Sequence, residues 1–332
     1  MQHPYLLFLG HETVLENAKT ATGIAYWRPE YCVGQFRQAA EAVDIGLPDL
    51  GLEQALDAGA KTLVIGLAPA GGMIDERWVP VILSALEKGM DVAAGLHHRL
   101  NSHKEIAEKA KACGRKLYDV RHPEKEYPVA VGVSRTGNRL LTVGTDCTVG
   151  KMYTSLAIEK EITARRGVAQ FRATGQTGVF IAGKGICVDA IVSDFVAGAA
   201  ETLTPANEAQ HWDIIEGQGS IFHPSFAAVT VGLLHGCQPN WLVLCHDAVR
   251  EHIEDMPDFP IVGLSECVDA YLSLAKLTSP KVQFAGVCVN TSKMSAFEAH
   301  DYMRAVEAEL GLPCCDPVRN GVRSIVDQLG VN

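Results

Sequence analysis

The sequence contains no run of basic residues and no pair of cysteines spaced as CxxC. Its 332 residues include 39 Asp and Glu against 29 Lys and Arg, so the net charge is −10 and a nucleic-acid backbone is not an expected partner. Its ten cysteines are scattered from Cys32 to Cys315. This distribution favours reduced thiols in a cytoplasmic protein over a disulfide framework or a zinc site.

A membrane-spanning segment is also missing from the pattern. Residues 217–246 contain no Asp, Glu, Lys or Arg, but Pro224, Pro239 and several glycines and histidines interrupt this stretch. It therefore predicts a buried strand–loop–strand segment, not a membrane span. The N-terminal MQHPYLLFLGHE has no basic region before its short apolar run, so no signal peptide is expected.

The length and the order of apolar segments predict two α/β domains, at 1–135 and 136–332. In the first domain we expect strands at Tyr5–Leu9 and Thr62–Ile65, and helices at Trp78–Lys88 and Lys104–Cys113. The glycine-rich turn at Gly71 and Gly72 lacks the GxGxxG spacing of a dinucleotide-binding fingerprint. A charged segment with prolines and glycines, 119–139, predicts the connection between the domains.

A second series of short apolar runs, separated by helical patterns, follows this connection. Six strands are expected, at Leu140–Val143, Val168–Arg172, Trp212–Ile215, Trp241–Cys245, Pro260–Gly263 and Phe284–Val289. Nearly continuous apolar strands alternating with helices are typical of a parallel sheet that is covered on both faces. The second domain is therefore expected to contain a mainly parallel sheet.

The segment GTDCTVGK, which begins at Gly144 and ends at Lys151, has the features of a phosphate-binding loop. It follows an apolar strand and precedes a helix, its glycines allow backbone N–H groups to curl around an anion, and Lys151 adds an ammonium group. Met152 stands where a nucleotide-hydrolysing loop carries a Ser or Thr hydroxyl for Mg²⁺. The loop therefore suits a pyrophosphate that undergoes no phosphoryl transfer, such as that of coenzyme A.

GTDCTVGKM resembles the lengthened loop of dethiobiotin synthetases, and four later segments resemble motifs of that family in the same order. These are FRATGQTG from Phe171, IIEGQGS from Ile214, GVCVNTS from Gly286 and GLPCCDP from Gly311. The resemblance implies a P-loop NTPase-like fold, with Asn290 at the position that contacts the base. Met152 and Arg172 depart from that family, at its magnesium-binding Thr and near its substrate-activating Lys.

Over its whole length the chain resembles a closer family of two-domain proteins, long described as of unknown function or as epimerases. The pattern ATGQTG…DAIVSDFVAGAAE…EGQGSIFHPSFAAVTVGLLHG carries this resemblance. The family has a Rossmann-like N-terminal domain and a P-loop domain, and its members include D-glutamate N-acetyltransferases. The resemblance implies acetyl transfer from acetyl-CoA to D-glutamate, in D-amino-acid catabolism. The residues expected to bind the coenzyme A are Gly144, Thr145, Asp146, Cys147, Thr148, Val149, Gly150, Lys151, Met152 and Asn290.

Three residues are candidates for the catalytic chemistry, namely Glu216, His223 and Asp194. Glu216 ends an apolar strand and could bind a metal, act as a base, or accept backbone N–H bonds. His223 follows the EGQGS turn and is equally compatible with a structural role, and Asp194 could hold or deprotonate an amine. Cys147 could form a covalent acetyl intermediate, although direct attack by the amine is simpler.

A dicarboxylate substrate calls for donors that bind carboxylates, above all arginine. Arg172 is the first candidate and Arg28, in YWRPEY, the second; the others are Gln176, Thr177, Asp189, Gln218 and Ser220. No metal is expected, and Mg²⁺ enters only if ATP is used. An ATP-dependent ligase or kinase of a small carboxylate is the alternative function, and a non-catalytic nucleotide sensor is a third. Resemblance to the ligases also implies a homo-oligomer.

Overall fold

The computed structural model describes residues 1–123 and 125–331, apart from the side chain at position 70. The chain forms two compact units. The first comprises Met1–Glu124 and Gly175–Ala190, and the second comprises Lys125–Thr174 and Ile191–Asn332. Both units have the α/β architecture that the alternation of apolar strands and helices predicts.

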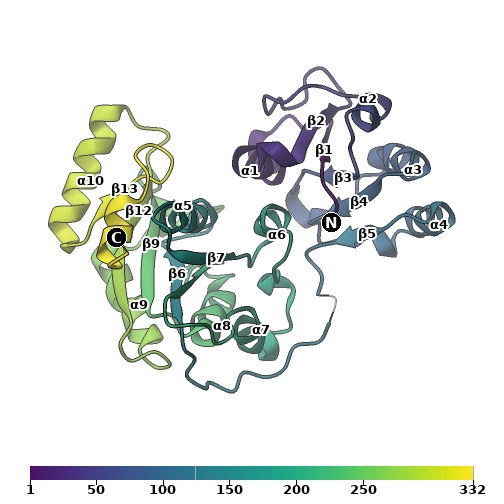
Figure 1. The fold of residues 1–332 in the computed structure, drawn as a ribbon. Helices are drawn as coiled ribbons and strands as arrows, with labels where there is room; N and C mark the ends of the chain where they lie inside the picture. Colours follow the sequence, from purple (N-terminus) through teal and green to yellow (C-terminus); the bar gives the residue numbers. More distant parts are fainter. Residues whose placement is uncertain (124, 332) are drawn as a thin grey trace. The chain divides into compact units, whose positions relative to one another are not determined.

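The first unit contains a five-stranded parallel sheet in the order β2-β1-β3-β4-β5. Its strands are β1 (Tyr5–Gly10), β2 (Cys32–Arg37), β3 (Thr62–Ile65), β4 (Asp91–Ala94) and β5 (Leu117–Asp119). Its helices are α1 (Lys19–Trp27), α2 (Leu52–Asp57), α3 (Val79–Glu87), α4 (Lys104–Cys113) and α6 (Gln176–Ala182). All residues of β1, β3 and β4 are buried, because α1 and α6 cover one face of the sheet and α3 and α4 the other (Figure 1).

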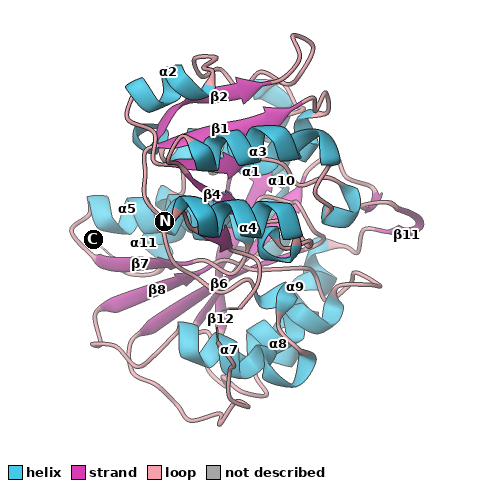
Figure 2. Ribbon diagram, turned by 90° about the vertical axis from the view of Figure 1, so that its right-hand side faces the viewer, coloured by secondary structure: helices cyan, strands magenta, loops and turns pink. Residues whose placement is uncertain are grey.

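The second unit contains a six-stranded parallel sheet in the order β13-β12-β9-β6-β8-β7. Its strands are β6 (Asn138–Gly144), β7 (Val168–Arg172), β8 (His211–Ile215), β9 (Trp241–Asp247), β12 (Gln283–Asn290) and β13 (Cys314–Cys315). Its helices are α5 (Lys151–Ala164), α7 (Val196–Leu203), α8 (Ala227–Cys237), α9 (Leu264–Ala275), α10 (Ala296–Leu310) and α11 (Arg323–Gln328). Figure 2 shows α5 and α11 on one side of the strands and α7 and α8 on the other.

The expected strand at Pro260–Gly263 is wrong. Pro260 is the last residue of β11 (Met256–Pro260), which pairs with β10 (His252–Ile253) in a separate antiparallel hairpin. Residues 261–263 then lead without regular structure into α9. Pro257 and Pro260 cannot donate ladder hydrogen bonds, so this segment suits a short exposed hairpin better than the interior of a parallel sheet. The buried strand–loop–strand expected at residues 217–246 is also wrong, because this stretch forms a loop, α8 and β9. An apolar run as long as residues 227–237 suits a buried helix as well as a strand. The other expected strands and helices are confirmed to within a few residues at their ends.

The division into units differs from the expected single boundary between residues 135 and 136, because Gly175–Ala190 packs within the first unit. In this segment α6 lies against α1, and the hydroxyls of Thr177 and Thr20 are 3.1 Å apart. The Cys187 thiol donates to the carbonyl of Val120. The segment buries Val179, Phe180 and Ile181. Burial of these apolar side chains favours its docking far from its neighbours in sequence.

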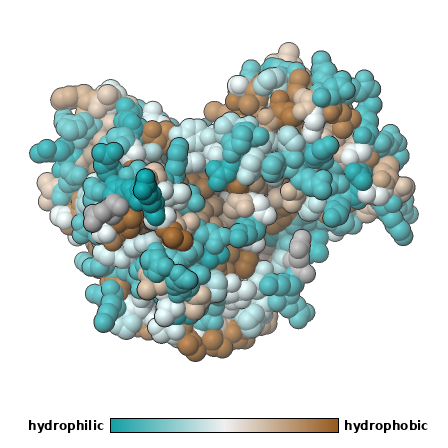
Figure 3. Space-filling model, in the orientation of Figure 1, coloured by the Kyte–Doolittle hydropathy of each residue, from teal (hydrophilic) through white to brown (hydrophobic). Residues whose placement is uncertain are grey.

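No helix in the described part of the chain is long and apolar enough to cross a membrane. On the face drawn in Figure 3, hydrophilic and hydrophobic residues are interspersed. Single exposed apolar side chains are ordinary on folded domains and need no special role.

Candidate functional site

The loop from Gly144 to Gly150 joins β6, in the interior of the second sheet, to the start of α5. Thr148 and Gly150 have left-handed backbone conformations, with φ of 51° and 96°. Such conformations turn successive N–H groups toward a common centre and form a concavity that suits an anion. The α5 helix begins at Lys151 without a side-chain cap, so the positive end of its dipole adds to this concavity.

Lys151 lies inside the loop and is only 6% exposed. Its Nζ donates a hydrogen bond of 2.7 Å to the carbonyl of Asp146. Burial lowers the pKa of this ammonium, while nearby groups that include Asp146 and Glu216 oppose the shift. A side chain at Gly217 would meet the Thr142 carbonyl at 1.8 Å and Lys151 Cδ at 3.0 Å, so the close packing around the lysine requires glycine. A buried cation of this kind favours an anionic ligand.

Asp146 is fully buried, and its carboxylate anchors the loop. Its Oδ2 accepts from Arg250 Nη1 at 2.8 Å and from the backbone N–H of Glu254 at 2.7 Å. Its Oδ1 accepts from the Cys147 N–H at 2.6 Å. Thr148 Oγ1 in turn donates to the Glu254 carboxylate. Asp146 was predicted to bind the cofactor, but these bonds hold the loop against the segment that follows β9.

Further side chains of the second unit hold the start of the loop. The Tyr271 hydroxyl donates to the Gly144 carbonyl at 2.7 Å, and the Ser220 hydroxyl donates to the Thr145 carbonyl at 3.1 Å. Thr145 Oγ1 and His246 Nδ1 share a hydrogen bond of 3.0 Å. Ser220 and Thr145 are completely buried, so the structure gives both of them a supporting role. The predicted contact of Ser220 with substrate gains no support from this geometry.

His246 should make the protein less stable as the pH falls below neutral. Burial lowers the pKa of this imidazole to about 4, whereas an unfolded chain binds the proton near the usual value of about 6.5. Between these two values the unfolded state binds more protons, so the free energy of unfolding decreases by up to about 3 kcal/mol as the pH drops from 6.5 to 4. Denaturant titrations at several pH values give the free energy of unfolding of wild type and of His246→Gln, and we expect this free energy to depend less on pH in the variant. An equal dependence on pH in both proteins would contradict the expectation.

Glu216 is 4% exposed and accepts a hydrogen bond of 2.8 Å from the Thr174 backbone N–H to its Oε2. This bond joins the ends of β8 and β7. Gln218 Nε2 donates to the Thr174 hydroxyl at 3.2 Å, so the same threonine also orients this amide. Of the roles considered for Glu216, the structure supports the acceptance of a backbone N–H, but the donor lies after β7 and not in the GQGS turn.

His223 is 3% exposed, and its Nδ1 accepts a hydrogen bond of 3.1 Å from the Ser225 N–H. In the neutral imidazole the proton must then reside on Nε2, so this atom can donate but cannot accept. The predicted role of general base is therefore not supported, whereas donation to an anion is. His223, Cys147 and Asp146 offer ligand atoms within 4.8 Å of one another. A metal would have to displace the bonds of His223 and Asp146, and we propose none here.

The remaining candidates in the second unit lie in different settings. Arg172 directs Nε and Nη2 to Asp213 Oδ1, both at 2.7 Å, so its guanidinium is engaged with a carboxylate of the protein itself. Asp194 is exposed in the short turn Ser193–Phe195 before α7. Asn290 ends β12, and its Oδ1 accepts from the Ser292 N–H at 3.1 Å. Burial raises the pKa of the Cys147 thiol, which disfavours the thiolate needed for a covalent acetyl intermediate.

Four predicted substrate residues belong to the first unit. Gln176 and Asp189 both contact Arg121, and Thr177 contacts Thr20. Arg28 follows α1, and its Nη1 donates to the Trp27 carbonyl at 2.9 Å. The structure thus brings Gln176 and Asp189 together around an arginine that the sequence analysis did not single out.

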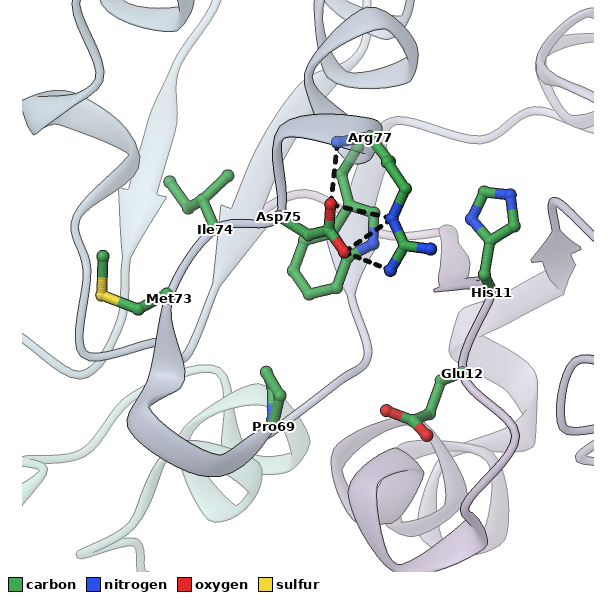
Figure 4. A pocket seen from close by; sticks show the side chains of 8 residues that line it. His11, Glu12, Pro69, Met73, Ile74, Asp75 and Arg77 are labelled. Carbon is green, nitrogen blue, oxygen red and sulfur yellow. Dashed lines mark hydrogen bonds and ion pairs between the residues drawn. The ribbon is translucent and has the colours of Figure 1, made fainter.

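A cavity of about 420 Å³ lies at the carboxyl ends of β1 and β3 in the first unit (Figure 4). It is lined by His11, Glu12, Pro69, Met73, Ile74, Asp75, Arg77 and Trp78. In the order β2-β1-β3-β4-β5 this is the switch point of the sheet, where open α/β folds bind ligands. Its carboxylates are already engaged, since Glu12 accepts from two backbone N–H groups and Asn17, and Asp75 is paired with Arg77.

Sequence reasoning missed Arg250, Tyr271 and Arg121. Arg250 follows β9, which neighbours β6 in the sheet, so the order of the strands would have pointed to it. Tyr271 lies within α9, and no local pattern connects it with Gly144. Arg121 follows β5, and its partners lie 55 and 68 residues further along the chain.

Comparisons with known proteins agree with this architecture. Residues 34–123 match a family described as "Domain of unknown function (DUF1611_N) Rossmann-like domain", and residues 128–326 match "Domain of unknown function (DUF1611_C) P-loop domain". A solved DUF1611 family protein from Anabaena variabilis is 33% identical, with a TM-score of 0.88, and the match covers 100% of both chains.

Two curated relatives cover nearly the whole chain. A "D-glutamate N-acetyltransferase" of Tritonibacter scottomollicae is 48% identical over 99% of both chains. A protein of the same name from Pseudoalteromonas sp. is 44% identical over 98% of both chains. The chain therefore belongs to the DUF1611 family of two-domain proteins, with a Rossmann-like N-terminal domain and a P-loop C-terminal domain.

Proposed function

We propose that this protein is an N-acetyltransferase that moves the acetyl group of acetyl-CoA to the amino group of D-glutamate, in the catabolism of D-amino acids. The observation that carries the proposal is the 48% identity to a D-glutamate N-acetyltransferase over 99% of both chains. The solved family member supports the same two-domain fold over the whole chain. The scattered positions of the ten cysteines, with no CxxC pair, support a reducing, cytoplasmic location.

The loop from Gly144 to Gly150 is the proposed site for the coenzyme A pyrophosphate. Its left-handed residues, the start of α5 and the buried Lys151 together favour a compact anion. Met152 offers no hydroxyl to a magnesium ion, and a pyrophosphate that is not cleaved does not need one. Asn290, at the end of β12, remains the proposed contact to the adenine.

This assignment changes the roles proposed for Glu216 and His223. Both residues border the loop, and the pantetheine arm of coenzyme A separates its pyrophosphate from its thioester by many bonds. Residues that contact the pyrophosphate therefore lie away from the reacting carbonyl. We assign His223 Nε2 as a hydrogen-bond donor to the cofactor, and Glu216 as the carboxylate that holds Thr174 beside the loop.

The reaction itself requires that the amine of D-glutamate lose a proton, that its nitrogen form a bond to the acetyl carbonyl carbon, and that the bond from this carbon to sulfur break. The departing thiolate takes up a proton. The chain contributes by holding both substrates in position, by accepting the proton and by stabilising the oxyanion. The raised pKa of the Cys147 thiol supports direct attack by the amine over a covalent intermediate.

The alternative function is an ATP-dependent ligase or kinase of a small carboxylate. The resemblance of Glu216 and Asn290 to positions in P-loop ligases favours it, whereas Met152 argues against it because a ligand of Mg²⁺ is missing. By the same resemblance we propose a homo-oligomer.

Release of free thiol from acetyl-CoA tests the proposal, with D-glutamate, L-glutamate or no amino acid, and with or without EDTA. We expect release that depends on D-glutamate and persists in EDTA, since the proposed loop needs no metal. If no acceptor leads to thiol release and the protein forms ADP from Mg·ATP, the acetyltransferase proposal is wrong and the ligase or kinase function takes its place. Dependence on L-glutamate alone would overturn the proposed stereochemistry.

A further inference from the structure

Arg121 follows β5 at the carboxyl edge of the first sheet, and only 12% of its side chain is exposed. Its Nη1 donates a hydrogen bond of 2.7 Å to Gln176 Oε1, and its Nη2 forms an ion pair with Asp189 Oδ2. All three residues belong to the first unit. A half-buried arginine therefore holds two residues that are remote from it in sequence.

These contacts determine which atoms Gln176 and Asp189 can offer to a ligand. A guanidinium group only donates, so the oxygen of the Gln176 amide must face Arg121 and its NH₂ group must face elsewhere. The pair with Asp189 occupies Oδ2 and leaves Oδ1 as an acceptor. The side chain of Asp189 is 28% exposed, and Gln176 and Arg121 are both partly exposed.

The free NH₂ group and the free carboxylate oxygen complement the two charged groups of an amino acid. The amide donates to a carboxylate, and the aspartate oxygen accepts from an ammonium. Arg121 makes this arrangement rigid, because its planar fork fixes both partners at once.

We propose that Gln176 and Asp189 bind the carboxylate and the ammonium of the acceptor amino acid, and that Arg121 is the positioning residue that orients them. This inference rests on the proposed acetyltransferase function and adds to it the residues that recognise the acceptor. His97 lies in the same cluster, where partial desolvation and the nearby Arg121 lower the pKa of its imidazole. A neutral imidazole does not compete with the ammonium for Asp189.

Two nearly isosteric substitutions test the proposal without removing the contacts of Arg121. Gln176→Glu keeps an acceptor for the arginine and replaces the free NH₂ group by an oxygen that repels a carboxylate. Asp189→Asn keeps an acceptor for the arginine and can present an NH₂ group to the ammonium. We expect each variant to raise KM for D-glutamate about 10- to 100-fold and to leave KM for acetyl-CoA unchanged.

Arg121→Met should raise KM for D-glutamate at least as much as these two variants do. Arg121→Lys should raise it less than Arg121→Met, because lysine keeps a positive charge. Arg99→Met is the matched control, since Arg99 is an exposed arginine of the same unit, and it should behave as wild type. If wild type acetylates D-glutamate but Gln176→Glu and Asp189→Asn keep its KM within about twofold, this inference is wrong and Arg121 only holds the segment. If wild type does not acetylate D-glutamate at all, the proposed function itself fails.

Discussion

Replacing Lys151 with methionine is expected to lower kcat/KM for acetyl-CoA by about 100-fold. Methionine keeps most of the length of the side chain, which is 6% exposed, but removes the ammonium group inside the loop. A hydrogen bond to a charged group contributes about 1.5–3 kcal/mol, and each 1.4 kcal/mol corresponds to about a factor of ten. Initial rates of thiol release at varied acetyl-CoA and saturating D-glutamate measure the effect.

Lys160→Met is the matched control, because Lys160 is exposed on the same helix, α5. It should retain the wild-type KM for acetyl-CoA. Lys151→Met should lower kcat/KM for acetyl-CoA and should leave KM for D-glutamate unchanged. A folded Lys151→Met protein with a wild-type KM for acetyl-CoA would show that the coenzyme A pyrophosphate binds elsewhere.

Replacing Asp146 with alanine is expected to destabilise the protein by about 3–5 kcal/mol, since two backbone N–H groups lose their acceptor and Arg250 loses its shortest ion pair. Asp146 is completely buried and accepts from Arg250, Glu254 and Cys147. Its loss would leave two backbone N–H groups without their acceptor, while Arg250 would keep the Cys147 carbonyl and the Glu254 carboxylate. The shift of the denaturant midpoint, with the slope of the transition held common, measures the change.

Arg250→Met and the double variant complete a thermodynamic cycle for this pair. We expect the two substitutions to be non-additive, because each alone removes the same ion pair. Asp301→Ala, at an exposed aspartate of α10, should change the free energy of unfolding by less than about 0.5 kcal/mol. Additive effects of the Asp146 and Arg250 substitutions would mean that the pair does not hold the loop.

Local patterns in the sequence were sufficient for the fold class. Apolar runs such as Leu140–Val143 are buried whatever their neighbours are. The glycines and the lysine of GTDCTVGK are close in sequence, so a strand, a loop and a helix could be predicted there. The prediction of a strand at Pro260–Gly263 was wrong, because an apolar run beside prolines is compatible with a strand and with the segment that leads into a helix.

The candidate site was only partly predictable. Lys151 lies in the loop with Glu216 nearby, and Gln176 and Asp189 both contact Arg121. Their partners, however, could not be inferred. Arg172 was chosen for a substrate carboxylate because of its place in a motif, but Asp213 on the neighbouring strand takes its guanidinium. Such pairs depend on which strands are neighbours in the sheet and on where the side chains point. The spacing of residues along the sequence does not contain this information.

The sequence by itself determined that the chain has two α/β parts, that the second contains a P-loop, and that this loop has Met152 in place of a hydroxyl residue. These properties depend on residues within a few positions of one another. Only the tertiary structure decided that Gly175–Ala190 packs in the first unit, that Arg250 anchors Asp146, and that Arg121 orients Gln176 and Asp189. Each of these contacts joins segments that are distant along the chain. The burial of apolar surface brings the segments together, and the charged pairs fix which side chains meet.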